Sequence, residues 1–136
     1  MKYKFMDTIT SDVMFEAYGK DPKELFENAA SALFSVICKI NDVKPKSSTK
    51  IEVKGEDMPD LMISWLQCLI ATVDTDEKFF SKFSITKITD TKLIADIYGE
   101  SITPELGDTV VKAVTYYKYK FEKKDDKYIA RISLDI

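Results

Sequence analysis

The groups best suited to do chemistry lie at the end of the chain. Asp135 is the penultimate residue, so its side-chain carboxylate lies one residue from the α-carboxylate of Ile136. Two carboxylates therefore converge where a chain ordinarily frays. Oxygen-only groups of this kind suit hard cations such as calcium, magnesium or manganese. A solvated acidic tail is the alternative that the sequence leaves open.

The absence of histidine and the small number of glycines exclude several kinds of catalysis. No histidine occurs among the 136 residues, so histidine-dependent catalytic triads are excluded. The chain also lacks a Gly-x-Gly-x-x-Gly or Gly-x-x-x-x-Gly-Lys motif and has only 4 glycines, so we expect no nucleotide hydrolysis by this chain alone. The two cysteines, Cys38 and Cys68, fit no metal-ligand spacing and are predicted to be buried, inert thiols.

Length and charge indicate one soluble, cytoplasmic domain spanning residues 1–136. Acidic residues outnumber basic ones by 23 to 20, and Arg131 is the only arginine. Because nucleic-acid backbones are bound by concentrated basic faces, we expect no strong direct binding of nucleic acid. The N-terminal segment lacks an apolar run of signal-peptide length, and nowhere do about 18 apolar residues run together. Neither secretion nor membrane insertion is therefore expected.

The acidic tail belongs to a predicted β-hairpin within residues 110–136. Its first arm alternates Tyr117, Tyr119 and Phe121 with charged residues, and Lys124-Asp125-Asp126 supplies the turn. The second arm places Tyr128, Ala130, Ile132 and Leu134 on one face. Alternation of the same kind predicts strands over Lys2–Phe5, Val13–Tyr18, Thr49–Gly55, Phe83–Thr89 and Leu93–Gly99.

Two helices are predicted between these strands. The first begins after a cap at Asp21 and extends to about Ile40, and the second begins after a cap at Asp57. The second carries a methionine and tryptophan stripe, including Trp65, whose spacing of three and four residues predicts core packing. Ile63 lies off that stripe, either as a contact for a partner or as an ordinary exposed apolar residue.

Together these elements predict an α+β fold. The expected architecture is a single domain in which two amphipathic helices pack on one face of a mixed, mainly antiparallel sheet. The other sheet face carries lysine, threonine and tyrosine, and is where we expect a partner to dock. The acidic run Asp74-Thr75-Asp76-Glu77 ends the second helix and opposes its dipole. This run is either simply solvated or kept for a cation or a basic partner.

The sequence also carries recognisable segments in a definite order. They are Thr10-Ser11-Asp12-Val13, Ala17-Tyr18-Gly19, Leu25-Phe26-Glu27-Asn28-Ala29-Ala30, Phe80-Ser81-Lys82-Phe83, Val111-Lys112-Ala113-Val114-Thr115-Tyr116 and Leu134-Asp135-Ile136. Over essentially the whole length they resemble the archease family. The resemblance implies a cytoplasmic, non-catalytic protein cofactor of tRNA splicing that activates the GTP-dependent RNA-splicing ligase, promoting its guanylylation and multiple turnover. A chaperone-like role toward a tRNA methyltransferase is the implied alternative.

The same resemblance implies a metal site and a functional lysine. By matching positions, Asp12, Asp135 and the terminal residue Ile136 would hold a divalent cation, with calcium favoured and magnesium or manganese as alternatives. Three carboxylates roughly 6 Å apart would repel by about 2–3 kcal/mol per pair at an effective dielectric of about 20, which a cation or a bound proton must offset. Lys112 is expected to contact the ligase, its nucleotide or these carboxylates, or else to be a solvated surface group.

Three positions depart from the family pattern. Ile9, Val73 and Tyr117 stand where the family tends to have histidine, so no histidine-assisted role is expected, whereas the carboxylate set is intact. We therefore carry three hypotheses forward. They are an activator of the ligase, a chaperone-like interaction module, and a stand-alone metal-dependent hydrolase for which the sequence offers ligands but no evident base.

Overall fold

Seven strands and two α-helices make up residues 1–7 and 12–136, the part of the chain that this computed structural model describes. The elements follow in the order β1 (Tyr3–Met6), β2 (Val13–Gly19), α1 (Pro22–Ile37), a 3₁₀ turn (Ile40–Asp42), β3 (Ser47–Lys54), α2 (Met58–Asp76), β4 (Lys78–Ile88), β5 (Lys92–Ser101), β6 (Ala113–Lys124) and β7 (Lys127–Asp135). Within these residues, neither helix is both long and apolar enough to cross a bilayer.

Both helices begin at the aspartate caps that the sequence predicts. The carboxylate of Asp21 accepts a 2.8 Å hydrogen bond from the Glu24 N–H, and Asp57 accepts a 2.9 Å bond from the Asp60 N–H. In each helix, the side-chain carboxylate of this first-turn residue, Glu24 or Asp60, also accepts a hydrogen bond from the backbone N–H of the residue just before the cap. These contacts satisfy backbone donors that have no partner within the helix, and so fix where each helix starts.

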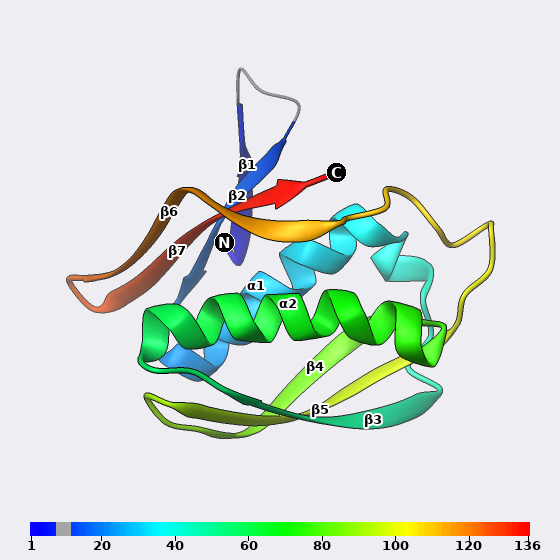
Figure 1. Cartoon of the computed structure of the whole chain (residues 1–136), viewed down its shortest axis with the longest axis horizontal. Coiled ribbons are helices and arrows are strands. Elements are labelled where there is room, and N and C mark those ends of the chain that lie inside the picture. Colours follow the sequence, from blue (N-terminus) through cyan, green and yellow to red (C-terminus); the bar gives the residue numbers. More distant parts are fainter. Residues whose placement is uncertain (8–11) are drawn as a thin grey trace.

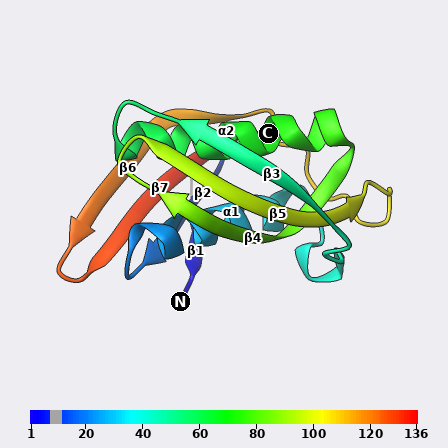
Figure 2. The ribbon, with the colours of Figure 1, turned by 90° about the horizontal axis from the view of Figure 1, so that it is seen from below.

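The strands divide between two antiparallel sheets. One sheet has the strand order β1-β2-β7-β6 and the other has the order β3-β5-β4. Within each sheet, all strand pairings are antiparallel. The helices lie between the sheets, with α1 against β2 and β4, and α2 against β3 and β6 (Figure 1). Seen from below, the β3-β5-β4 sheet crosses in front of both helices (Figure 2). The molecule is therefore a three-layer α+β domain.

The predicted α+β class is confirmed, but the helices are covered by two sheets where the sequence pattern suggested one. The reason lies in α1, whose buried residues extend beyond a single stripe. Ala29, Ala30 and Ala32 are all 0% exposed, and these small side chains let the backbone of α1 approach its neighbours closely. A helix that is apolar on more than one side must be packed on more than one side.

Ile63 is neither an exposed contact for a partner nor an ordinary exposed apolar residue, so both predictions for it are wrong. It is only 8% exposed and belongs to the core. The stripe prediction for α2 is confirmed, because Met62 and Trp65 are fully buried and the indole N–H of Trp65 donates to the carbonyl of Phe26 at 3.0 Å. That bond ties α2 to α1 across the centre of the molecule.

The cysteines differ from each other in burial. Cys38 is buried, and burial together with the nearby Asp108 charge raises the pKa of its thiol to about 12. Cys38 is therefore the inert thiol that was expected. Cys68 is only half-buried, although it too is a free cysteine.

Several boundaries differ from the predicted ones for local reasons. Helix α1 ends at Ile37 instead of about Ile40, because Cys38 is extended and forms an isolated bridge with Gly107. Strand β4 begins at Lys78, well before the predicted start at Phe83. Its pairing with β5 is irregular at two places, and such irregularities break the alternation on which the prediction depended.

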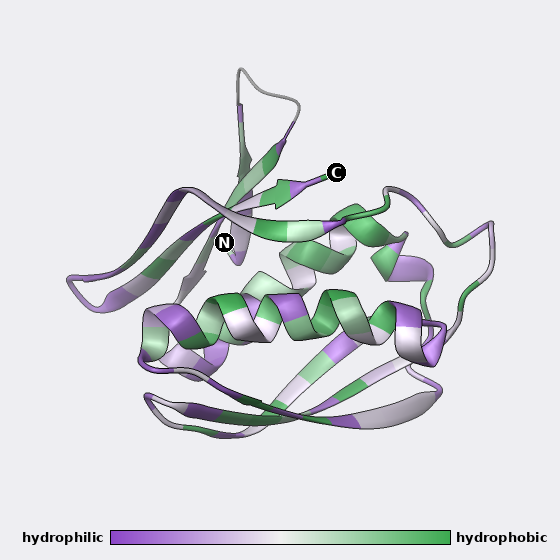
Figure 3. Cartoon of the chain, viewed as in Figure 1, coloured by the Kyte–Doolittle hydropathy of each residue, from purple (hydrophilic) through white to green (hydrophobic). Residues whose placement is uncertain are grey.

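The terminal hairpin is confirmed, with one distortion. On β7, Ala130, Ile132 and Leu134 are fully buried, as the alternation predicts. On β6, regular pairing stops after Thr115 and resumes at Lys120. The outer end of this hairpin is largely hydrophilic (Figure 3).

Replacing Gly99 is expected to destabilise the fold. A Cβ at this position of β5 would collide with the Phe79 carbonyl oxygen and lie 2.8 Å from the Phe80 Cα. We expect Gly99→Ala to lower the free energy of unfolding by about 3 kcal/mol, measured by urea denaturation with the fluorescence of the single tryptophan. Gly107→Ala is the matched control, because its Cβ would meet the Phe79 ring at 3.6 Å, an ordinary contact. Equal losses in the two variants would contradict the packing described.

Candidate functional site

The pairing of β2 with β7 brings the two predicted aspartates to the same end of neighbouring strands. Val13 pairs with Leu134 at the last pair of this ladder. Asp12 precedes Val13, and Asp135 follows Leu134. Residues opposite each other in an antiparallel pair have Cα atoms about 4.5–5.5 Å apart, so the residues that flank this pair, Asp12 and Asp135, lie at the same end of the two strands. Both residues are half-buried.

Strand β6 brings Lys112 to the same end. Asp135 pairs with Ala113, and the Lys112 N–H donates a 2.7 Å hydrogen bond to the Asp135 carbonyl oxygen. Lys112 itself is exposed, and Ile136 is 39% exposed. The backbone therefore brings four residues to the place where β2 and β6 begin and β7 ends. These residues are Asp12, Asp135, Ile136 and Lys112.

A charged cluster on the outer face fixes the register that produces this arrangement. Glu16 pairs with Arg131 across β2 and β7, and the guanidinium donates to one Glu16 carboxylate oxygen at 3.0 and 3.2 Å. The Tyr18 hydroxyl donates to the other oxygen at 3.0 Å. Burial alone would raise the pKa of Glu16, but the hydrogen bonds from Arg131 and Tyr18 outweigh it and hold that pKa below 4.5. The pKa of Tyr18 is raised, first by burial and then by its bond to the carboxylate.

The strand ends offer a donor set for a hard cation. Nowhere in residues 1–7 and 12–136 do three His, Cys, Asp or Glu side chains gather as a metal-binding group. The predicted set is different in kind, because it combines two aspartates with the backbone carboxylate of Ile136. Carboxylate oxygens, with no histidine in the chain, fit calcium, magnesium or manganese and are a poor match for softer metals.

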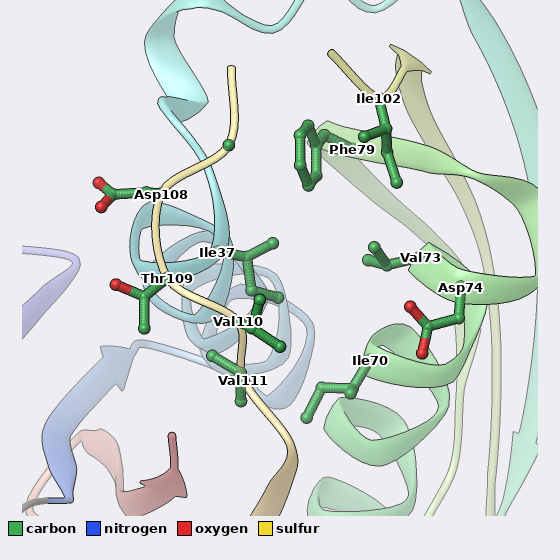
Figure 4. Close-up of a pocket in the computed structure, with 11 residues that line it drawn as sticks. Ile37, Ile70, Val73, Asp74, Phe79, Ile102, Asp108, Thr109, Val110 and Val111 are labelled. Carbon is green, nitrogen blue, oxygen red and sulfur yellow. The ribbon is translucent and has the colours of Figure 1, made fainter. Parts of the chain in front are cut away.

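The three positions that lack the expected histidines lie in different surroundings. Ile9 falls outside the described residues. Val73, in α2, lines an apolar pocket of about 260 Å³ together with Ile37, Ile70 and Phe79 (Figure 4). Tyr117 is exposed on the irregular part of β6, and its carbonyl accepts a bond from the Ser133 hydroxyl at 2.8 Å. Val73 and Tyr117 are therefore not brought together by the fold.

Sequence reasoning missed the pocket beside Val73. The pocket lies where α1 and α2 end, and the segment from Ile102 to Val111 closes it. The apolar residues Ile102 and Val110 in this connection were the available signal. Ile102 is 42% exposed and Val110 is 80% exposed.

The fold and the strand-end residues define a class of small α+β protein, in which two helices lie between two antiparallel sheets and two aspartates flank the pair between the start of β2 and the end of β7. Within that class the chain has a definite place. The model of the archease protein family matches residues 3–136, and the chain belongs to this family.

Individual relatives agree with that placement. The chain is 34% identical to the protein archease of Sulfurisphaera tokodaii, with 99% of each chain covered, and 37% identical to that of Pyrococcus abyssi, with 93% of this chain and 94% of the relative covered. A solution structure of a Methanobacterium thermoautotrophicum protein shares 33% identity and a TM-score of 0.84 over 99% of each chain. A Thermotoga maritima archease, described as a possible chaperone, shares the fold at 18% identity and a TM-score of 0.69, covering 93% of this chain and 92% of its own.

The Glu16 cluster predicts how stability depends on pH. A carboxyl group with a lowered pKa in the folded state stabilises the fold above its unfolded pKa, and this contribution is lost as the pH falls through the folded-state pKa. We therefore expect Glu16→Gln to lose about 1 kcal/mol at neutral pH and to show a shallower loss of stability below about pH 4.5, measured by urea denaturation at several pH values. Glu56→Gln, at an exposed site before α2, should leave the profile unchanged. A parallel profile for wild type and Glu16→Gln would count against the cluster.

Proposed function

We propose that this chain is a non-catalytic activator of the GTP-dependent RNA-splicing ligase of tRNA splicing. In this proposal it acts in the cytoplasm, where it promotes guanylylation of the ligase and allows multiple turnover. One observation supports the proposal: Val13, which follows Asp12, pairs with Leu134, which precedes Asp135 and the last residue of the chain. Membership of the archease family supports the assignment, because the family resemblance implies the same residues.

The three carboxylates are proposed to hold a divalent cation, with calcium favoured and magnesium or manganese as alternatives. A bound divalent cation supplies positive charge that can neutralise phosphate oxygens during guanylylation. The chain's own part is to keep the carboxylates of Asp12, Asp135 and Ile136 in place. Antiparallel pairing on both sides of β7 does this, since it holds Asp135 between β2 and Lys112.

Lys112 is proposed to meet the partner directly. Its backbone is fixed by the bond to Asp135, while its side chain is exposed. An ammonium group at the rim of a carboxylate cluster attracts phosphate as a point charge. Lys112 therefore suits contact with the ligase, with its nucleotide or with the carboxylates themselves.

A second candidate is a chaperone-like role, which the description of the Thermotoga maritima relative favours. The exposed aromatic residues of β6 would serve such a role, since Tyr116 is 68% exposed and Tyr117 is 40% exposed. In that case the aspartates would be dispensable. No observation favours a tRNA methyltransferase as the client.

Cation binding can be tested without the ligase. Calcium is titrated into the full-length chain by isothermal titration calorimetry, with manganese and magnesium in parallel. Asp12→Asn and Asp135→Asn should each weaken binding by about 10-fold or more, because each removes one anionic ligand. Asp126→Asn, in the exposed turn after β6, is the matched control. Wild-type affinity in both site variants would remove the proposed ligand set.

Activation is tested by the turnover of a purified RNA-splicing ligase with GTP and manganese, with and without this protein. We expect turnover to rise above one product per ligase only when the protein is present. Residues appended after Ile136 should abolish the effect, because they convert the terminal carboxylate into a neutral amide, whereas residues added before Met1 should have no effect. Equal ligase turnover with and without the protein would contradict the proposal. Full activity of the C-terminal extension would contradict the role of the terminal carboxylate alone.

A further inference from the structure

A central apolar pocket and two neighbouring hollows, together called the groove, lie where both helices end. The centre of the groove is the apolar pocket of about 260 Å³, whose walls include Ile70 and Val73 of α2, Ile37 of α1 and Phe79 at the start of β4 (Figure 4). Asp74 is the acidic residue on the α2 wall, beside Val73 and Ile70.

Acidic hollows flank the central pocket on both sides. One shares Ile102 with it and is lined by Asp76 and Glu77. The other shares Asp108 with it and includes Asp42. Acidic residues therefore line the hollows next to the apolar pocket at both Ile102 and Asp108.

Few cations offset this charge. Lys39 lines the second flanking hollow, and its ammonium group donates to the carbonyl oxygen of Glu105 at 2.7 Å. Within residues 1–7 and 12–136, the side-chain ion pairs involve Glu16, Glu52, Glu100 and Glu122, all of which lie outside the groove. The carboxylates along the groove therefore contribute negative potential to it.

The helices add to that potential. Both α1 and α2 end at the groove, and neither carries a basic residue in its last turn. A helix C-terminus bears a partial negative charge that a nearby cation stabilises by about 0.3–1 kcal/mol. Two such ends beside several carboxylates favour a positively charged occupant.

Exposed apolar side chains also line the central pocket, so a ligand that carries only charged groups would leave this apolar surface uncovered. Ile102 is 42% exposed and Val110 is 80% exposed, and both line the central pocket. We infer that the groove docks a segment of a partner protein in which one aliphatic side chain is flanked on both sides by lysine or arginine. The aliphatic group would enter the pocket, and the basic groups would meet Asp74 and the flanking carboxylates.

The groove also adjoins the strand-end cluster. Val111 lines the pocket, and the next residue, Lys112, is bonded to Asp135. A segment bound in the groove would therefore hold a partner beside the proposed cation ligands. This inference does not depend on the identity of that partner or on the presence of a cation.

The test uses the ¹⁵N-labelled full-length chain and three blocked peptides. Lys-Ala-Leu-Ala-Lys is titrated to millimolar concentration, alongside Glu-Ala-Leu-Ala-Glu and Lys-Ala-Ser-Ala-Lys. We expect the first to shift backbone amide resonances of Val73, Asp74 and residues 107–111, and the other two to shift them far less. Asp74→Asn should weaken binding by about 3-fold or more, whereas Asp90→Asn, which removes the same charge from the β4–β5 turn, should not.

Three outcomes would overturn the inference. The first is equal shifts with the acidic peptide, and the second is shifts confined to other parts of the chain. The third is self-association of the free chain at micromolar concentration in sedimentation velocity that Val110→Asp abolishes, since this would assign the groove to a second copy. Because none of these measurements involves the ligase or calcium, they fail or succeed separately from the proposed function.

Discussion

The antiparallel pairing of β2 with β7 is the constraint on which the site depends. It brings residues from opposite ends of the sequence into adjacent strands, and it sets which of them lie opposite each other. A slip of one residue would turn the inner side chains of β7 outward, so the buried Ala130, Ile132 and Leu134 hold the register from the core side. The paired charges of Glu16 and Arg131 hold it from the outer side. The buried side chains and the Glu16–Arg131 pair therefore together determine which residues lie beside each other at the strand ends.

The packing of the helices between two sheets also determines which parts of the helices reach the surface. Because α1 and α2 are packed on both sides, their flanks are used for the core and their C-terminal ends remain at the surface. Those ends converge on the segment that leads into β6, and this segment continues to Lys112. The acidic groove and the carboxylate cluster are thus connected through Val111 and Lys112, which are neighbours in the chain.

Local patterns predicted those elements whose burial differs clearly between faces. On β7, Ala130, Ile132 and Leu134 alternate with Arg131, Ser133 and Asp135 because one face of the strand packs on the core. Both helix starts were predictable from their caps and prolines. The division into two sheets could not be predicted, because alternation does not specify which strands pair. The predicted exposure of Ile63 is wrong for a related reason, because a helix that is covered on several sides buries residues outside its main apolar stripe.

The candidate site was predictable only in part. The tail carboxylates stand out in the sequence, but the proximity of Asp12 depends on pairing across almost the whole chain, which no local pattern contains. Family resemblance pointed to Asp12 where local reasoning did not. The groove remained hidden because its walls come from α1, α2, β4 and the connection before β6. Its best signal, the exposure of Val110 and Ile102, is visible only in three dimensions.

The central position of β7 has a consequence for biosynthesis. The strand lies between β2 and β6, yet it follows both of them in the chain. While the polypeptide is still being translated, β2 has no partner on that side and exposes an unpaired edge together with Phe15. Such long-range pairing is slow to form, and it cannot begin before β7 has been translated. The cluster at the strand ends thus assembles only on a polypeptide that has been translated through β7.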